Sequence, residues 1–307
     1  MKKFYLSLLA AVALLTVGCN PTPDPDNDEP TPTPDTGGTM KEFVVNIDAP
    51  TSRAAIAENN ISLWSAGDEL TVVRFDSPTT RPKLVQSTID NSSINGSSAK
   101  FTTLGLVNEI GEQYAVYPKN TSSASNFASG SAESGRIFSI TLPEQSLDSN
   151  GNLKYPLLIG SYDSSTKSFT MKSPLALLQL SIQTPATESI EYTLNSITVS
   201  GNNSEKMWGD VTLLTSDPVA SFSKATLTEC SLACNGIKIG KQGTIINIFV
   251  PMQNYTKGLT IEVKCTEGVM TKSILDGGFD ASETKLIESD LTLELEKSPI
   301  LVQQVFA

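Results

Sequence analysis

Hydrophobic and polar residues alternate along most of the chain after residue 40. In residues 41–48, Phe43, Val45 and Ile47 fall on one face of an extended segment, and polar residues dominate the other face. Successive side chains of a strand point to opposite faces, so this period of two indicates a strand with one buried side. The pattern predicts that these three apolar side chains belong to a core.

Similar runs recur at short intervals and are separated by clusters of Gly, Asn, Asp and Ser, which favour turns. The predicted strands are residues 69–75, 84–89, 99–103, 113–117, 136–142, 169–183, 192–200, 209–214, 224–232, 244–250, 259–265, 269–275 and 286–295. No segment has the spacing of a long amphipathic helix. Many short strands at this spacing predict an all-β fold built from β-sandwiches.

The folded part of the chain divides into two halves. Each half has about 130 residues, which is enough to bury a core of its own. A Gly-Asp pair opens a strand in both halves, at residues 67–68 and 209–210. We therefore expect two tandem sandwiches, residues 40–185 and 186–307, with a boundary near Pro185.

The first nineteen residues have the organisation of an export signal. Lys2 and Lys3 precede an apolar run over residues 4–17, and a small residue stands before Cys19. The run is too short for a permanent membrane span. The pattern predicts a bacterial lipoprotein signal, residues 1–18, whose removal leaves Cys19 as an acylated N-terminus anchored in the cell outer membrane. An ordinary secretory signal with an incidental cysteine is the alternative.

Residues 19–39 form the predicted tether between the lipid and the folded part. After the cysteine they contain repeated prolines and no large apolar side chain. At about 3.1 Å per residue, an extended proline-rich segment of this length spans on the order of 60 Å. We expect a flexible linker that holds the folded part away from the membrane, at the cell surface.

Composition excludes several classes of function. The chain has 22 basic and 33 acidic residues, and this net charge of −11 disfavours nucleic acid as a partner. It contains no histidine, which excludes Ser-His-Asp triads, Cys-His pairs and histidine-ligated zinc. Cys230, Cys234 and Cys265 are predicted to be buried free thiols, with a soft-metal site as the alternative. We expect no catalytic residues, no metal and no cofactor.

Five motifs, in this order along the chain, resemble those of the fimbrillins, the pilus subunits that Bacteroidetes build from lipoprotein precursors. The motifs are Thr51-Ser52-Arg53-Ala54, the run Trp64-Ser65-Ala66-Gly67-Asp68-Glu69-Leu70-Thr71-Val72, Tyr117-Pro118, Ser173-Pro174-Leu175-Ala176-Leu177-Leu178-Gln179-Leu180 and Phe249-Val250-Pro251-Met252. The resemblance covers most of residues 41–295. It implies two transthyretin-like β-sandwich domains, lipoprotein export, cleavage by an arginine-specific protease after the first strand, and strand exchange with other fimbrial subunits.

Arg53 is the best candidate for the cleavage site among four arginines. Arg74 lies in a predicted strand, Arg81 precedes a proline, and Arg136 follows a loop and ranks second. A cut between Arg53 and Ala54 would separate the first strand covalently from the rest of the chain. The alternative is that Arg53 is a solvated turn residue.

The departure of that strand, with Phe43, Val45 and Ile47, would leave unpaired backbone and empty apolar pockets, which invite a strand from another subunit. The candidate donor is the C-terminal tail, which follows Pro299 and carries almost no charge. Its apolar residues are Ile300, Leu301, Val302, Val305 and Phe306. They occur on both faces, so the tail is alternatively the last strand of its own domain.

Two other functions share the same outline. A surface glycan-binding lipoprotein of a polysaccharide-uptake system would have the same lipid, spacer and stacked sandwiches, and Trp64 and Trp208 are its candidate stacking residues. A glycosidase needs a converging pair of carboxylates, and no particular pair stands out. The sequence therefore favours a structural subunit of a fimbria.

Overall fold

A computed structural model of the chain describes residues 40–48, 61–62, 64–76, 82–105, 111–119, 127–128, 137–148, 151–187, 189–214, 220–280 and 286–294. These residues form 23 strands and one short 3-10 helix, η1 (Asn91–Ser93). The all-β prediction is confirmed. Within the described part of the chain, no helix has the length and apolar character to cross a membrane.

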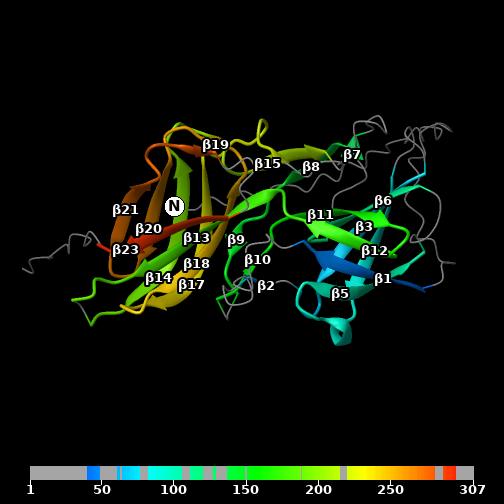
Figure 1. Cartoon of the computed structure of the whole chain (residues 1–307), viewed down its shortest axis with the longest axis horizontal. Coiled ribbons are helices and arrows are strands. Elements are labelled where there is room, and N and C mark those ends of the chain that lie inside the picture. The colour runs from blue at the N-terminus through cyan, green and yellow to red at the C-terminus, as the bar shows by residue number, and fades with distance from the viewer. Residues whose placement is uncertain are drawn as a thin grey trace, which may run out of the picture. The chain divides into compact units, whose positions relative to one another are not determined.

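Seven strands close into a barrel. In spatial order they are β1 (Met40–Ile47), β12 (Ser168–Lys172), β11 (Leu158–Asp163), β6 (Glu112–Tyr117), β3 (Glu69–Phe75), β4 (Lys83–Ile89) and β5 (Ser98–Leu104). β1 runs parallel to β12 and antiparallel to β5, and Figure 1 shows it in blue between them. Because the sheet is closed, β1 is paired along both of its edges.

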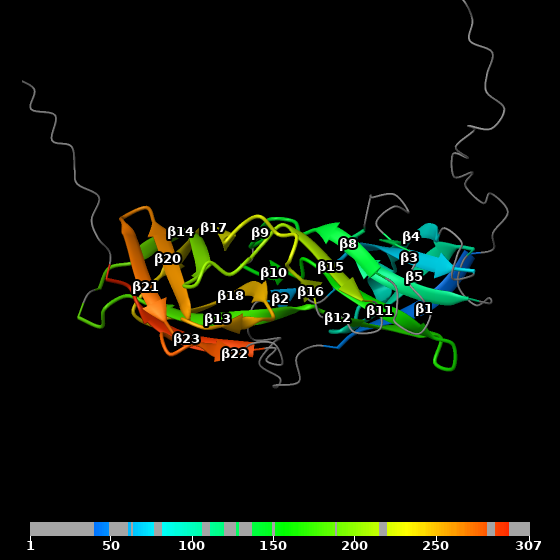
Figure 2. The same ribbon diagram turned by 90° about the horizontal axis from the view of Figure 1, so that it is seen from above.

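Two further sheets pack as layers, as Figure 2 shows. One contains β21 (Val269–Ile274), β20 (Leu259–Cys265), β14 (Tyr192–Gly201), β17 (Glu229–Ile239) and β9 (Gln145–Ser146), and the other β18 (Thr244–Pro251), β13 (Leu175–Gln183) and β23 (Leu286–Thr292). Leu178 of β13 and Ile197 of β14 are both fully buried in the same core. Two layers around an apolar core are a β-sandwich, as predicted.

Short strands complete the structure. A four-stranded sheet contains β16 (Ala220–Ser221), β15 (Asp210–Leu214), β8 (Ile137–Thr141) and β7 (Phe127–Ala128). Two further sheets have two strands each. One pairs β10 (Leu153–Lys154) with β2 (Ile61–Ser62), and the other pairs β19 (Asn254–Tyr255) with β22 (Phe279–Asp280). β8, β9 and β13 precede Pro185 but pair with strands that follow it. Residues 37–307 group into one compact unit, and the division into two domains near Pro185 stays a prediction.

Most predicted strands are found within one or two residues of their expected bounds. β3 and β20 match the predictions for 69–75 and 259–265. The predicted strand 169–183 is wrong as a single element, since it divides into β12 and β13 around Pro174. Proline has no N–H to donate to a sheet, so it interrupts the ladder.

Of the four cysteines, the three in the described residues, Cys230, Cys234 and Cys265, are buried free thiols, as predicted. Burial raises the pKa of the Cys234 thiol to about 12 and that of Cys265 to about 11, and it also raises the pKa of Cys230. The described residues contain no group of cysteine, aspartate and glutamate side chains suited to holding a metal ion. These thiols therefore serve the fold as small apolar side chains.

Candidate functional site

Three apolar side chains of β1 point into the core of the closed sheet. Phe43, Val45 and Ile47 are 3%, 0% and 5% exposed, as the alternation predicts. The ring of Phe43 meets that of Phe169 edge to face at 5.1 Å between centroids and stacks on that of Phe101 at 6.2 Å. β1 is therefore a core strand of the closed sheet.

We call the space that β1 occupies between β5 and β12 the β1 slot. Its lining is formed by the residues paired with Phe43, Val45 and Ile47, which are Ala99, Phe101, Phe169 and Met171. Directly paired residues point to the same face of a sheet, and all four of these side chains are buried. Val45, for example, lies between Ala99 and Phe169. The slot is therefore apolar along both flanks.

The remaining contacts of β1 are mainly backbone hydrogen bonds. At its C-terminal end, Ile47 N donates to Ser97 O at 2.8 Å, and Asp48 N donates to Met171 O at 2.7 Å. One ion pair joins the strand end to β12, with Lys172 Nζ 3.8 Å from Asp48 Oδ2 and both side chains partly exposed. Another extended apolar segment could reproduce most of these contacts, because backbone ladders do not depend on side-chain identity.

The segment that follows the candidate cleavage site is held differently. β2 pairs with β10, and Trp64 is 6% exposed with its ring edge-on to Phe101 and Tyr117, at 5.0 and 5.5 Å. The indole Nε1 of Trp64 donates to Ser97 O at 3.1 Å. Trp64 is therefore a buried residue that closes the core beside the β1 slot.

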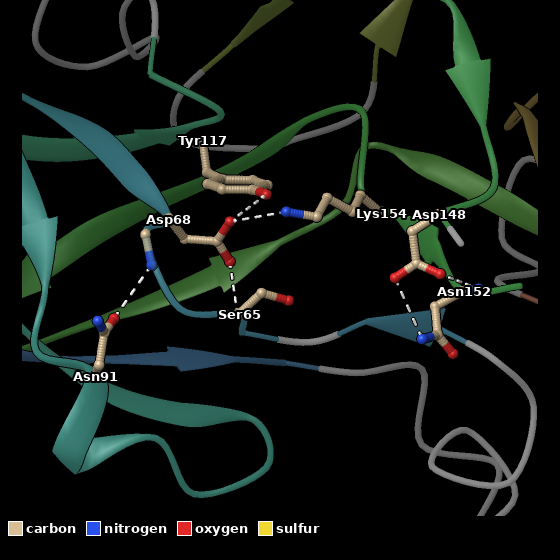
Figure 3. Close-up of polar contacts among 8 residues, drawn as sticks. Ser65, Asp68, Asn91, Tyr117, Asp148, Asn152 and Lys154 are labelled. Atoms are coloured by element: carbon tan, nitrogen blue, oxygen red, sulfur yellow. Dashed lines mark hydrogen bonds and ion pairs between the residues drawn. The ribbon is translucent and has the colours of Figure 1, made fainter. Parts of the chain in front are cut away.

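Asp68 connects three parts of the chain, as Figure 3 shows. Its Oδ2 accepts a hydrogen bond from Ser65 N at 2.7 Å, and its Oδ1 accepts from Tyr117 Oη and from Lys154 Nζ, both at 3.2 Å. Asp68 is 6% exposed, whereas the side chain of Lys154 is 49% exposed. Burial and the Asp68 carboxylate raise the pKa of Tyr117, which therefore stays a protonated donor. We call Ser65, Asp68, Tyr117 and Lys154 the Asp68 cluster.

The turn that presents Asp68 requires glycine. Gly67 has a φ of +84°, a conformation that residues with a Cβ rarely adopt. Its N–H donates to Asn91 Oδ1 at 3.1 Å, which Figure 3 also shows, and Asp68 N donates to Ser65 O at 3.1 Å. The motif from Trp64 to Asp68 is thus a tight turn that fastens the chain downstream of the candidate cleavage site.

Several predicted site residues lie outside the described residues. These are the lipidation residue Cys19, the cleavage pair Arg53 and Ala54, and the donor residues Ile300, Leu301, Val302, Val305 and Phe306. Their roles stay predictions. The described residues end at Asp48 before Arg53 and begin again at Ile61 after it, so both flanks of this segment are defined.

The Asp68 cluster is the feature that the sequence interpretation missed. The Gly-Asp pair was interpreted as the start of a strand and Tyr117 as the end of one, and both belong to the five motifs. Lys154 is 86 residues from Asp68 along the chain, and no local pattern connects the two. The one available signal was an aspartate four residues after a motif tryptophan.

The two tryptophans do not form a sugar-binding surface. Trp64 and Trp208 are each 6% exposed, and Trp208 Nε1 donates to Pro143 O at 3.1 Å. Stacking on a sugar ring requires an accessible aromatic face. The geometry of these residues therefore gives no support to the glycan-binding alternative.

The sequence matches no protein-family profile and no curated protein. The chain is similar to a solved structure of a candidate cell adhesion protein from Bacteroides ovatus, at 14% identity and a TM-score of 0.44 over 79% of this chain and 88% of that one. A fimbrial protein from Bacteroides vulgatus is 10% identical, with a TM-score of 0.38 over 82% and 94%. The tip fimbrial protein Mfa3 of Porphyromonas gingivalis, with a C-terminal truncation, is 12% identical, with a TM-score of 0.36 over 77% and 82%. These neighbours are fimbrial proteins and a candidate cell adhesion protein, and at this distance they support no assignment of residues.

Proposed function

We propose that the protein is a structural subunit of a cell-surface fimbria that supports adhesion. It is exported as a lipoprotein to the outer membrane and assembled by protease-triggered strand exchange. The observation that carries the proposal is the way β1 is attached. β1 completes a closed sheet, yet apolar contacts and backbone hydrogen bonds hold it, and the chain leaves it through the segment that contains Arg53.

Cleavage after Arg53 would turn β1 into a separate chain that is held only by non-covalent contacts. Burial of three large apolar side chains stabilises it by about 1.5–3 kcal/mol each. Once β1 leaves, Phe101, Phe169 and Met171 lose their cover, and the facing edges of β5 and β12 lose their hydrogen-bond partners. A strand from another subunit would satisfy both edges at once.

The downstream flank stays in place during this exchange. Trp64 and the Asp68 cluster fasten the chain from the tenth residue after the new N-terminus at Ala54. Before cleavage, acyl chains on Cys19 hold the precursor at the outer membrane through the linker over residues 20–39. The tail residues Ile300 to Phe306 would supply the donor strand for a neighbouring subunit. An arginine-specific protease and other subunits are therefore the partners of this mechanism.

N-terminal sequencing of the protein recovered from the cell surface tests the maturation step. We expect copies that begin at Ala54, and we expect Arg53→Ala to abolish them while Arg136→Ala, the matched control, leaves them. A surface population that begins only at acylated Cys19 would contradict cleavage-triggered assembly.

Deletion of residues 299–307 tests the tail. The shortened chain can fill only a position in which no neighbouring subunit takes up its donor strand. We therefore expect isolated fimbriae from cells that produce it to contain less of the protein. Incorporation at the level of the full chain would remove the tail from the mechanism. Neither outcome depends on which residue the protease selects.

A further inference from the structure

The β1 slot accepts apolar side chains at three alternate positions. Phe43, Val45 and Ile47 are each 5% exposed or less, and none of these three side chains carries a polar atom. The side chains paired with them, Ala99, Phe101, Phe169 and Met171, carry no nitrogen or oxygen. A donor strand with an amide side chain at any of the three positions would bury that amide without a side-chain partner.

The C-terminal tail does not offer this pattern. As an extended strand, it has Ile300, Val302, Gln304 and Phe306 on one face, and Leu301, Gln303, Val305 and Ala307 on the other. Every set of three successive same-face residues within residues 300–307 includes Gln303 or Gln304. Reversing the direction of insertion leaves the composition of each set unchanged.

We infer that the β1 slot of this chain receives its donor strand from a different subunit and not from a second copy of the chain. The inference rests on the proposed strand exchange and names the partner. An unpaired buried amide costs about 1–3 kcal/mol, which corresponds to about 5- to 150-fold in affinity. The tail of this chain would in turn serve a subunit whose slot accommodates a glutamine.

The chemistry of the missing donor follows from the slot. It is an extended, uncharged segment of another subunit with three large apolar side chains at alternate positions. The side chain that replaces Phe43 meets Phe101 and Phe169, so an aromatic residue fits there best. Polar residues are acceptable between these positions, since Asn46 occupies such a place in β1 and is only half-buried.

A displacement experiment on the cut protein tests this inference. The full chain is cleaved after Arg53 and incubated with a synthetic peptide of residues 299–307 or with the same peptide carrying Gln304→Val. The variant has four apolar residues on one face. Release of the segment that contains β1 is then followed by chromatography. We expect the Gln304→Val peptide to release it at an at least 5-fold lower concentration than the native peptide. A Gln304→Asn peptide, the polar control, should behave like the native one.

The same substitution in the full chain gives a second measurement. After cleavage, the Gln304→Val chain should form oligomer ladders on an unheated gel, whereas the native chain should remain monomeric. The uncut Gln304→Val chain is the matched control, because its slot is occupied and only non-specific association could link it. Equal behaviour of native and Gln304→Val sequences, including no effect of either, would overturn the inference. If the proposed function itself is wrong, N-terminal sequencing will show surface copies that all begin at Cys19, which is a different outcome from the two above.

Discussion

β1 and the turn from Trp64 to Asp68 flank the same candidate cleavage segment but are held by opposite means. β1 relies on three apolar side chains and a backbone ladder, which other sequences can imitate. The turn relies on a buried carboxylate with three partners and on an indole hydrogen bond, which depend on exact side chains. The difference indicates that β1 is the flank that another strand can replace, whereas the turn stays in place.

The largest effect is expected from Phe43→Ala, which empties the space between Phe101 and Phe169. Large-to-small changes of a buried phenylalanine cost about 3–5 kcal/mol of unfolding free energy. Urea unfolding of the uncut chain should show this loss, and the cut chain should release β1 faster. Glu42→Ala is the matched control, because Glu42 lies on the exposed side of the same strand. A loss below about 1 kcal/mol would show that the apolar contacts of β1 matter less than its ladder.

The next largest effect is expected from Asp68→Ala. The change leaves the buried Tyr117 hydroxyl and the Ser65 N–H without their acceptor, and an unsatisfied buried polar group costs about 1–3 kcal/mol. We expect a loss of about 2–3 kcal/mol in urea unfolding, with the release of β1 after cleavage unchanged. Lys154→Ala should cost less than about 1 kcal/mol, since this side chain is half-exposed. If Asp68→Ala accelerates the release of β1, the turn helps to hold β1, and the two flanks are not held independently.

The sequence was sufficient to predict β1 and most other strands, because one buried face imposes a period of two that is local in the chain. It could not predict closure of the first sheet, since β1 pairs with β12 at Val45 and Phe169, and no local pattern selects a partner so far away. For the same reason, two strands that are consecutive in the sequence need not pair, as at the turn over residues 240–243. β17 and β18 are consecutive there, but they pair with β14 and β13 in different sheets.

Alkaline pH should weaken the turn flank and not β1. Burial and Asp68 raise the pKa of Tyr117 above the ordinary value of about 10. The unfolded chain then loses this proton before the folded chain does, so the stabilisation is complete below pH 10 and declines as the pH rises above it. At pH 11 the loss from this group is about 1.4 kcal/mol. The free energy of unfolding should therefore decrease less between pH 8 and pH 11 for Tyr117→Phe than for the native chain. An equal decrease in the two chains would contradict this role of Tyr117.

The smallest effect is expected at the single described ion pair of the β1 end, between Lys172 and Asp48. The two atoms are 3.8 Å apart and both side chains are partly exposed, a geometry that contributes no more than about 0.5 kcal/mol. Lys172→Met should therefore leave both stability and β1 release within this margin, and added salt should change release little. Lys83→Met removes a similarly exposed pair with Asp76, outside the β1 slot, and is the control. A several-fold faster release in Lys172→Met alone would mean that a charge selects the strand in the slot, and an uncharged donor would then be a poor replacement for β1.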